Sequence, residues 1–314
     1  NSKPLAVYVA PDAREALELL NKNGIASFRT PESCAEGIKA YLNNKAPEII
    51  NHNIDDLKFK NIKKFFKSLN NKNLTEFEAL KVFDNIGINT VKSEIISNPT
   101  NTKELINEIG FPLVMKILSS EIQHKTDAGG VELNIFSEED LKLRYDKLFK
   151  VFQKLKIEDD KKQFIIQKME TGIAEIILGY RVDELVGPIV VVGSGGILSE
   201  VYDDKSVRIA PVDFKEAKNM ISEVKSFIIF NGYRGLPNTD TDVLARAIVN
   251  ISQLAFVEEI KEAEINPVII KKEKGGIVAV DGLINLNWYF FKHFLKTDKI
   301  YIYLLNYYFI IIKW

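Results

Sequence analysis

Two short apolar runs alternate with helical patterns at the beginning of the chain. Residues 5–9 and 25–28 are apolar runs that predict strands, and each is followed by a segment with apolar residues at helical spacing. Gly24 ends the first helix, and Pro31 suits the first position of the second. One such strand–helix–strand–helix unit is too small to bury its own core. We therefore expect residues 1–43 to be the end of a domain whose body precedes this sequence.

Residues 44–73 differ in texture because they are rich in asparagine and lysine. Five lysines lie within residues 58–67 alone. We interpret residues 44–73 as a solvated linker. A basic patch that binds nucleic acid is the alternative, but no pattern of aromatic residues and glycines supports it.

A capping box opens the next segment, since Thr75 and Glu78 have the spacing of the two partners at a helix N-terminus and Gly87 ends that helix. Strands and helices then alternate. We expect strands near residues 91–96, 112–117, 130–135, 163–168, 175–182, 188–193 and 277–280, and helices near 101–109, 138–155, 213–222 and 239–257. This mixture predicts an α/β (α+β) domain over residues 74–284.

The final stretch, residues 285–314, has a composition unlike the rest. It holds 11 aromatic residues, including both tryptophans, and it lacks Ala, Gly, Val, Pro, Ser and Glu. Its frequent residues share AT-rich codons, as an out-of-frame stretch would. The apolar run at 300–312 is shorter than the roughly 20 residues that a membrane span needs. We therefore predict no contact with a membrane and assign this tail no function.

Charge and composition exclude several classes of protein. The 314 residues include 42 basic and 43 acidic ones, so the net charge of −1 gives no basic field for nucleic acid. One cysteine, Cys34, excludes a disulfide framework and a thiolate zinc cluster, and is typical of a reducing compartment. Asn1 stands where a starting methionine is usual, and no signal-peptide pattern follows. We expect a piece of a longer, cytoplasmic protein.

Two groups of residues suggest a site for an anion. Lys116 ends an apolar strand, where a lysine is either an edge residue with its ammonium in solvent or a cation directed at an anion. Nine residues later Lys125 precedes Gly129 and Gly130, whose backbone can approach a ligand closely. His124 beside them can act as a nucleophile or proton carrier near neutral pH. The alternative is an ordinary hairpin turn with solvated neighbours.

A third group is a glycine-rich turn after a predicted strand. It contains Gly193, Gly195 and Gly196, with Glu200 and Arg208 downstream. The spacing differs from the G-x-G-x-x-G pattern of dinucleotide-binding proteins, and no clear helix follows. The turn is more typical of a loop that contacts a substrate or a phosphate.

A fourth group could hold a metal ion. Alternation along a strand places Glu264 and Asn266 on one face, and Asp281 ends a second strand that could pair with the first. Carboxylate and amide oxygens are the ligands that Mg²⁺ takes when it bridges nucleotide phosphates. Considered alone, the Asn-Pro sequence that begins at Asn266 is simply a turn signal.

Together and in this order, Lys116, the His124-Lys-Thr-Asp-Ala-Gly-Gly-Val loop, the Glu264-Ile-Asn-Pro motif and Asp281 resemble one known family. It is the ATP-grasp domain of ADP-forming acyl-CoA synthetases, also called NDP-forming acetate–CoA ligases and related to succinyl-CoA synthetase. The resemblance runs from about residue 74 to 284. It implies an ATP-grasp fold, with two lobes that hold the nucleotide between them. Residues 24–32 are similar to the end of the family's flavodoxin-like CoA-ligase domain, so the resemblance implies that a remnant of that domain precedes the ATP-grasp fold.

The resemblance implies an activity and its catalytic groups. The family interconverts carboxylate, CoA and ATP with acyl-CoA, ADP and phosphate, and the phosphate passes through a histidine. His124 matches a second phosphohistidine, although a histidine that only hydrogen-bonds phosphate is the alternative. Lys116 and Lys125 would hold the phosphates of ATP or ADP, with Lys125 beside the catalytic His124. The metal ligands of Mg²⁺ would be Glu264, Asn266 and Asp281.

The remaining implied contacts are to the nucleotide and the transferred phosphate. Gly129 and Gly130 would cradle phosphates, and Glu175 would bind the ribose hydroxyls. Gln167, Lys168 and Met169 would face the adenine. The wall near the transferred phosphate would include Gly195, Gly196, Glu200 and Arg208.

Two other functions stay open on the sequence. One is the ATP-grasp-like region of a protein acetyltransferase that carries the same ligase-like domains. The other is a non-catalytic nucleotide-binding module. In the acyl-CoA synthetase interpretation, ATP is the partner of this chain, while the carboxylic acid and CoA bind through domains expected before Asn1. The acyl substrate is not readable from these residues.

Overall fold

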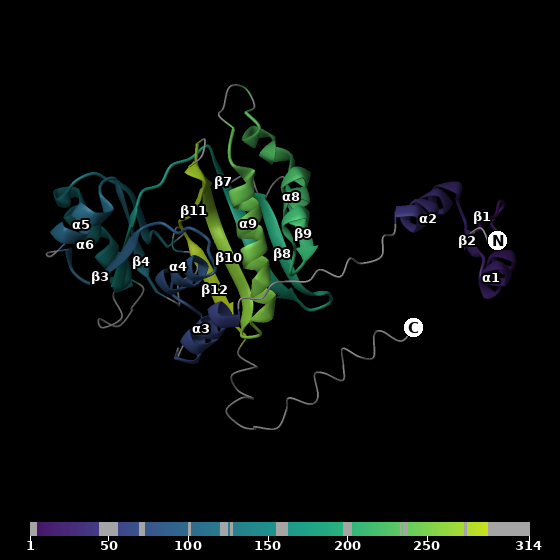
Figure 1. The fold of residues 1–314 in the computed structure, drawn as a ribbon, viewed down its shortest axis with the longest axis horizontal. Coiled ribbons are helices and arrows are strands. Elements are labelled where there is room, and N and C mark those ends of the chain that lie inside the picture. Colours follow the sequence, from purple (N-terminus) through teal and green to yellow (C-terminus); the bar gives the residue numbers. More distant parts are fainter. Residues whose placement is uncertain are drawn as a thin grey trace. The chain divides into compact units, whose positions relative to one another are not determined.

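The chain forms two compact units, one within residues 1–51 and the other within residues 52–314. Their elements are labelled in Figure 1. The computed structural model describes residues 5–43, 56–68, 73–99, 102–119, 125, 128–154, 163–196, 203–232, 234, 238–272 and 275–287.

The first unit consists of two strands and two helices. β1 (Ala6–Tyr8) and β2 (Ala26–Phe28) pair in parallel and are joined by α1 (Arg14–Lys22), and α2 (Pro31–Asn43) follows. The predicted order of elements is confirmed. Leu17 and Cys34 are the buried apolar side chains among the described residues of this unit. The unit therefore has a very small core.

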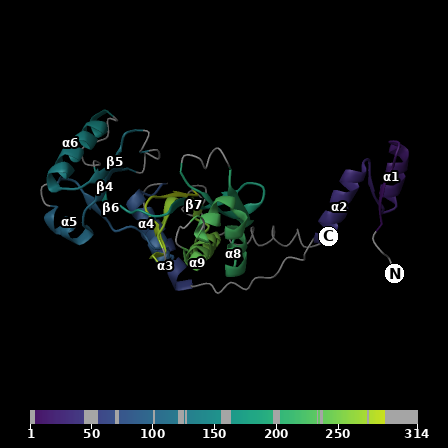
Figure 2. The same cartoon turned by 90° about the horizontal axis from the view of Figure 1, so that it is seen from above.

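The smaller sheet of the second unit is antiparallel, in the order β3–β6–β4–β5. Its strands are β3 (Ser93–Ile96), β4 (Leu113–Leu118), β5 (Val131–Ile135) and β6 (Gln163–Lys168). Helices α5 (Lys103–Ile109) and α6 (Glu138–Lys154) pack against Leu113, Met115 and Ile117 on one face (Figure 2). Because side chains alternate along a strand, Lys116 points away from these helices.

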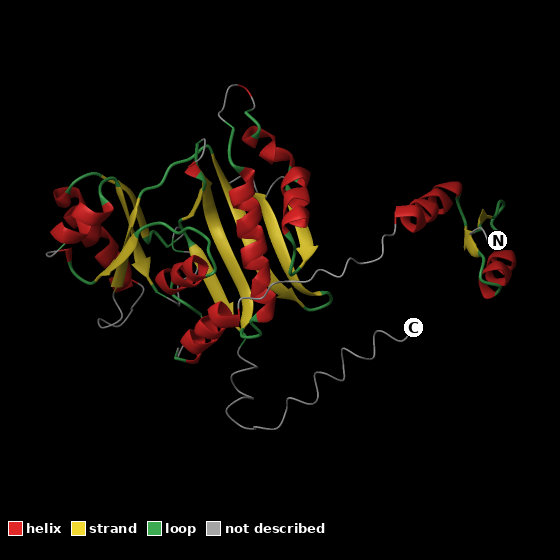
Figure 3. Ribbon diagram, viewed as in Figure 1, coloured by secondary structure: helices red, strands yellow, loops and turns green. Residues whose placement is uncertain are grey.

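The larger sheet has the order β11–β10–β7–β8–β9 and is also antiparallel. β12 and β11 follow each other along the same edge of β10. Helices α8 and α9 lie across one face (Figure 3), where they cover the buried Ile176, Leu178 and Tyr180 of β7. The bounds are β7 (Ala174–Asp183), β8 (Gly187–Ser194), β9 (Lys205–Ile209), α8 (Phe214–Glu223), α9 (Thr241–Ser252), β10 (Ile260–Ile270), β11 (Ile277–Ala279) and β12 (Gly282–Leu286), with 3₁₀ turns at Lys225–Phe230 and Gln253–Phe256.

Part of the predicted linker is an amphipathic helix. The lysine-rich residues 58–67 lie in α3 (Asp56–Lys67), whose Phe59, Ile62 and Phe66 are buried in the main core. Their three- and four-residue spacing places them on one face of the helix, whereas Lys60 and Lys64 are exposed. No helix in the described part of the chain is long and apolar enough to cross a membrane.

The predicted capping box is confirmed at the start of α4 (Glu76–Asn85). The Thr75 hydroxyl accepts from the Glu78 N–H, and the Glu78 carboxylate accepts from the Thr75 N–H at 2.8 Å. Phe83 on the same helix is fully buried, and a side chain in place of Gly282 would come within 2.7 Å of its ring. This close packing fixes α4 against β12 and so fixes the first turn of α4 in space.

A buried carboxylate on β5, paired with two cations of α6, makes the stability of the smaller lobe sensitive to acid. Glu132 has a side chain only 5% exposed, and it accepts from Arg144 at 2.7 Å and Lys147 at 2.5 Å. Burial alone would raise the pKa of Glu132, but the hydrogen bonds from Lys147 and Arg144 lower it below the ordinary 4.5. A lowered pKa stabilises the folded state above the unfolded pKa, and that contribution is lost as the pH falls through the folded pKa.

We therefore expect wild-type protein to lose more stability than Glu132→Gln between about pH 5 and pH 3. Urea unfolding at a series of pH values measures this difference. Glu94→Gln, at an exposed glutamate of β3 in the same sheet, is the control and should follow the wild type. Equal pH slopes for wild type and Glu132→Gln would contradict the prediction.

Candidate functional site

Lys116 lies in the interior of the smaller sheet with its ammonium directed at the larger lobe. β4 is paired on both sides, by β5 and β6, and Lys116 is only 6% exposed. The interpretation of Lys116 as a solvated edge residue is therefore wrong. Its Nζ donates to Glu76 Oε1 at 2.7 Å, to the Val280 carbonyl at 3.0 Å and to Asp281 Oδ2 at 3.2 Å.

Glu76, in the first turn of α4, is the centre of a charged cluster. Its side chain is fully buried, and it accepts from Lys116, from Lys125 Nζ and from Gln167 Nε2, the last at 2.9 Å. We call Glu76, Lys116, Lys125, Gln167 and Asp281 the charged cluster. It joins α4, the smaller sheet and the segment between β11 and β12.

Lys125 is brought to the cluster by the glycines that follow it. The Gly130 N–H donates to the Lys125 carbonyl at 2.7 Å, and the Gly130 carbonyl accepts from the Ile117 N–H at 2.9 Å. A Cβ at Gly130 would be 3.1 Å from the Lys125 carbonyl oxygen, and Gly129 has φ +68°, which favours glycine. The loop thus folds back onto β4, which places Lys125 near Lys116. His124 lies outside the described residues.

The protonation states within the cluster depend on each other. Burial alone would raise the pKa of Glu76, but the charges of Lys116 and Lys125 hold it below its ordinary value. Burial would likewise lower the pKa of Lys116, but its attraction to Glu76 and Asp281 raises it. For Asp281, burial raises the pKa despite the nearby lysines. At neutral pH Glu76 is therefore an anion and Lys116 is a cation.

Of the three predicted metal ligands, Glu264 and Asn266 are in side-chain contact, and Asp281, a member of the charged cluster, is linked to Asn266 through the backbone. Asn266 Nδ2 donates to Glu264 Oε1 at 3.2 Å, and the Asn266 N–H donates to the Asp281 carbonyl at 3.3 Å. Within the described residues, no group of three or more His, Cys, Asp or Glu side chains could hold a metal ion. Two carboxylates and one amide nevertheless fit Mg²⁺, which usually binds one or two protein carboxylates and completes its shell with phosphates and water.

The residues predicted to face the adenine have separate environments. Gln167 is buried in the charged cluster, whereas Lys168 Nζ donates to the Gly110 and Phe111 carbonyls at the end of α5. The Met169 N–H donates to the Pro112 carbonyl at 2.9 Å. The Gln167 and Lys168 side chains therefore hold the end of β6 in place.

The glycine-rich turn lies against Glu175, another predicted nucleotide contact. The Gly195 N–H donates to the Glu175 carbonyl at 2.9 Å, and a Cβ at Gly195 would be 2.8 Å from that same carbonyl. Only glycine allows this approach, while the Glu175 residue itself is exposed. Gly196 follows with φ +80°, and Glu200 lies outside the described residues.

Comparisons with known proteins agree with this geometry. Residues 66–286 match a family model described as an ATP-grasp domain. The chain is 35% identical over 212 residues to the β subunit of acetate–CoA ligase [ADP-forming] I from Pyrococcus furiosus, covering 67% of this chain and 90% of that subunit. The chain belongs to the ADP-forming acyl-CoA ligase family. Its ATP-grasp domain is the part that carries the charged cluster.

Two further relatives show how this ligase-family chain compares in fold and length. A structure of dinucleotide forming acetyl-coenzyme A synthetase 1 from Ca. Korarchaeum cryptofilum, in complex with coenzyme A and Ca-AMPCP, superimposes with a TM-score of 0.67 and 30% identity. It covers 73% of this chain and 99% of that one. 4-Hydroxybutyrate–CoA ligase [ADP-forming] of Nitrosopumilus maritimus is 32% identical over 78% of this chain. The matched region spans only 35% of the length of that ligase.

Arg208 is not brought to the charged cluster of the ligase-family domain. It lies on β9, where its guanidinium pairs with Glu216 and Glu223 on α8 and donates to the Ser206 hydroxyl at 3.3 Å. Glu216 and Glu223 are eight and fifteen residues from Arg208 in sequence. Arg208 therefore fastens α8 to the larger sheet.

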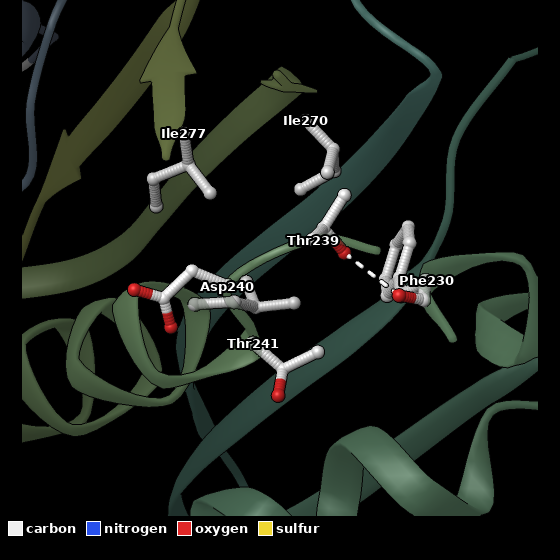
Figure 4. Close-up of a pocket in the computed structure, with 7 residues that line it drawn as sticks. Phe230, Thr239, Asp240, Thr241, Ile270 and Ile277 are labelled. Carbon is white, nitrogen blue, oxygen red and sulfur yellow. Dashed lines mark hydrogen bonds between the residues drawn. The ribbon is translucent and has the colours of Figure 1, made fainter. Parts of the chain in front are cut away.

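A depression at the start of α9 is a packing feature. Figure 4 shows Phe230, Ile270 and Ile277 around it, with the Thr239 hydroxyl donating to the Phe230 carbonyl at 3.4 Å. Its lining is largely apolar and includes none of the predicted site residues. In this ligase-family domain the depression is therefore a small gap in the packing between α9 and the ends of β10 and β11.

Glu76 is the residue of the cluster that sequence analysis missed. It stands two residues before the capping Glu78, where an acidic residue is explained by the helix dipole alone. The available signal was an acid on the side of α4 that also carries the buried Ala79, Leu80 and Phe83. A carboxylate at such a position must have buried cationic partners.

Proposed function

We propose that this chain is the nucleotide-handling part of an ADP-forming acyl-CoA ligase, which interconverts carboxylate, CoA and ATP with acyl-CoA, ADP and phosphate. The observation that carries the proposal is the convergence of Lys116 and Lys125, from two separate segments, at one buried carboxylate, with Asp281 bound to Lys116 from a third segment. The names of the relatives, which are ADP-forming CoA ligases, support the same reaction. The carboxylic acid and CoA would bind through further domains of the complete enzyme, in a cytoplasmic setting.

The lysines would supply most of what phosphoryl transfer requires. Transfer between phosphates needs positioning and neutralised charge more than covalent participation by the protein. Three protons on Lys116 are already used, by Glu76, Val280 and Asp281, so a phosphate oxygen has to replace one of them. Asp281 at 3.2 Å is the longest of the three contacts and the one expected to give way.

Asp281 and Asn266, with Glu264 behind them, would hold Mg²⁺. When bound, the ion would supply positive charge that offsets the charge of the phosphates. An Asp281 carboxylate released from Lys116 is then available for this ion. Glu264 would keep the Asn266 amide oriented through their 3.2 Å hydrogen bond.

His124 would carry the phosphoryl group. A neutral imidazole nitrogen attacks the γ-phosphorus of ATP, so that an N–P bond forms while the bond from the γ-phosphorus to the β–γ bridging oxygen breaks. ADP leaves with that electron pair, and the proton carried by the other ring nitrogen of the imidazole is lost to solvent. The neighbouring Lys125 would neutralise charge during transfer. Gly129 would bring its backbone N–H to the phosphates, while Gly130, whose N–H donates to the Lys125 carbonyl, would let the loop approach them closely.

The nucleoside would lie where β6, β7 and the glycine-rich turn meet. Of residues 167–169, Met169 would face the adenine, because the Gln167 and Lys168 side chains have other partners. The exposed Glu175 would bind the ribose hydroxyls. Gly195 and Gly196 would form a wall beside it, together with Glu200, whereas Arg208 would support that wall through α8.

The test of this function is phosphorylation of the chain itself. We expect purified protein incubated with γ-labelled ATP and Mg²⁺ to acquire a label that is stable in base and labile in acid, as a phosphohistidine is. His124→Ala should acquire none and should still bind ATP. ATP binding by the wild type without any label would remove His124 from the mechanism and leave a nucleotide-binding module. Failure to bind ATP would contradict the proposed function altogether.

A further inference from the structure

We propose that Glu76 is a positioning residue, whose carboxylate holds Lys116 and Lys125 next to each other for the phosphates of the nucleotide. This role rests on the proposed function, because it concerns how the same site is assembled. Glu76 itself is fully buried and would not touch the nucleotide. It acts through the two lysines.

The two oxygens of Glu76 divide their partners between different parts of the fold. Oε1 accepts from Lys116 on β4 at 2.7 Å and from Gln167 on β6 at 2.9 Å. Oε2 accepts from Lys125, which belongs to the segment between β4 and β5. Each ammonium is thus bound to a different oxygen of one rigid carboxylate. The spacing of the two cations is set by that group.

Electrostatics explains why this position needs a carboxylate. Two ammonium groups held close together repel each other. An anion between them offsets that repulsion, and each ammonium is hydrogen-bonded to one of its two oxygens. Gln167 completes the set as a neutral donor, so that it fixes the carboxylate without adding a third charge.

The alternative role, stabilisation of the α4 N-terminus, is already filled by another residue. Glu78 accepts from the Thr75 N–H at 2.8 Å and from the Thr75 hydroxyl at 2.7 Å. Among the described residues, the Glu76 side chain makes no hydrogen bond to the backbone of the first turn of α4. A helix cap therefore does not require Glu76, and packing alone would favour an apolar side chain at a fully buried position.

The first test compares Glu76→Gln with Glu78→Gln in the full chain. Glutamine at 78 still serves as a capping-box partner, so it is a matched control on the same helix. Affinities for ATP with Mg²⁺ and for adenosine, which lacks phosphates, are measured by calorimetry. We expect Glu76→Gln to weaken ATP binding by at least about tenfold and adenosine binding by less than about twofold, because only charged contacts are lost. Glu78→Gln should change neither.

A double-mutant cycle with Lys125→Met then tests whether Glu76 acts through a lysine. We expect the loss of ATP affinity caused by Glu76→Gln to shrink by at least about threefold when Lys125 is already absent. An equal loss in both backgrounds would overturn the proposal. So would an equal loss of ATP and adenosine affinity, since that is the result of general damage to the fold.

Glu76→Asp keeps the charge and provides a second variant if Glu76→Gln does not fold. We expect it to fold and to recover part of the ATP affinity, because one missing methylene lengthens the contacts without removing the anion. If the wild-type protein binds ATP and the Glu76 variants bind it equally well, the positioning role alone is overturned. Wild-type protein that binds no ATP would overturn both the role and the proposed function.

Discussion

Replacing Lys116 with methionine is expected to weaken ATP binding strongly and to destabilise the ATP-grasp domain. Methionine fills a similar volume within β4 but leaves Glu76 with Lys125 as its remaining cationic partner in the cluster. Removing one member of a buried ion pair destabilises a protein by about 3–5 kcal/mol. Because Lys125 still compensates part of the Glu76 charge, we expect about 3 kcal/mol, the lower end of this range. Loss of a charged contact to phosphate should weaken ATP binding by about a hundredfold.

Chemical denaturation and ATP titration of Lys116→Met measure the two effects separately. Lys150→Met is the matched control, because Lys150 is an exposed lysine of α6. It should unfold and bind ATP as the wild type does. Normal ATP affinity in a folded but destabilised Lys116→Met would show that Lys116 serves the structure and not the nucleotide.

Much of the fold is predictable because its signals are local. The Thr75–Glu78 capping box, the strand that carries Lys116 and the Gly129–Gly130 turn depend on residues close together in sequence. The structure confirms each of these features. The same holds for the alternation that places Glu264 and Asn266 on one face of β10, where their side chains are hydrogen-bonded.

The charged cluster could not be predicted in the same way, because its contacts span large distances in sequence. Glu76 and Lys116 are 40 residues apart, and Lys116 and Asp281 are 165 apart. Lysine alone does not reveal whether its partner is a nucleotide phosphate, a neighbouring helix or a buried acid. The family resemblance supplied Lys116, Lys125 and Asp281, but not the carboxylate that assembles them.

Composition misled the interpretation of residues 58–67 for a different reason. The five lysines there suggest a solvated segment, yet Phe59, Ile62 and Phe66 have helical spacing and are buried. Long lysine side chains on an amphipathic helix remain in solvent while the apolar face packs. Periodicity was therefore the better guide than charge content. Arg208 is a similar case, since its partners on α8 account for its charge.

Asp281→Asn is expected to impair phosphoryl transfer far more than nucleotide binding. Asparagine has nearly the same shape and keeps one oxygen, which can accept from Lys116 Nζ as Asp281 Oδ2 does at 3.2 Å, but it loses the second oxygen, which accepts from the Gly282 N–H at 2.8 Å. It removes, however, the negative charge that would hold Mg²⁺. Mutation of residues that only hydrogen-bond to metal ligands reduces metal affinity by about 10–100-fold. Loss of the negative charge of a ligand itself should therefore raise the Mg²⁺ concentration that labelling requires by at least about tenfold.

The rate of protein labelling by γ-labelled ATP, measured across a range of Mg²⁺ concentrations, tests this expectation. Asp146→Asn, at an exposed aspartate of α6, is the control and should show the wild-type dependence. Excess Mg²⁺ should restore part of the rate to Asp281→Asn if the carboxylate binds the ion. If the Mg²⁺ dependence of Asp281→Asn is unchanged and its ATP affinity is reduced, the role of Asp281 is to bind Lys116 and not the ion. The ammonium would then keep this partner throughout the reaction, and the phosphate would have to displace the Val280 carbonyl from Lys116.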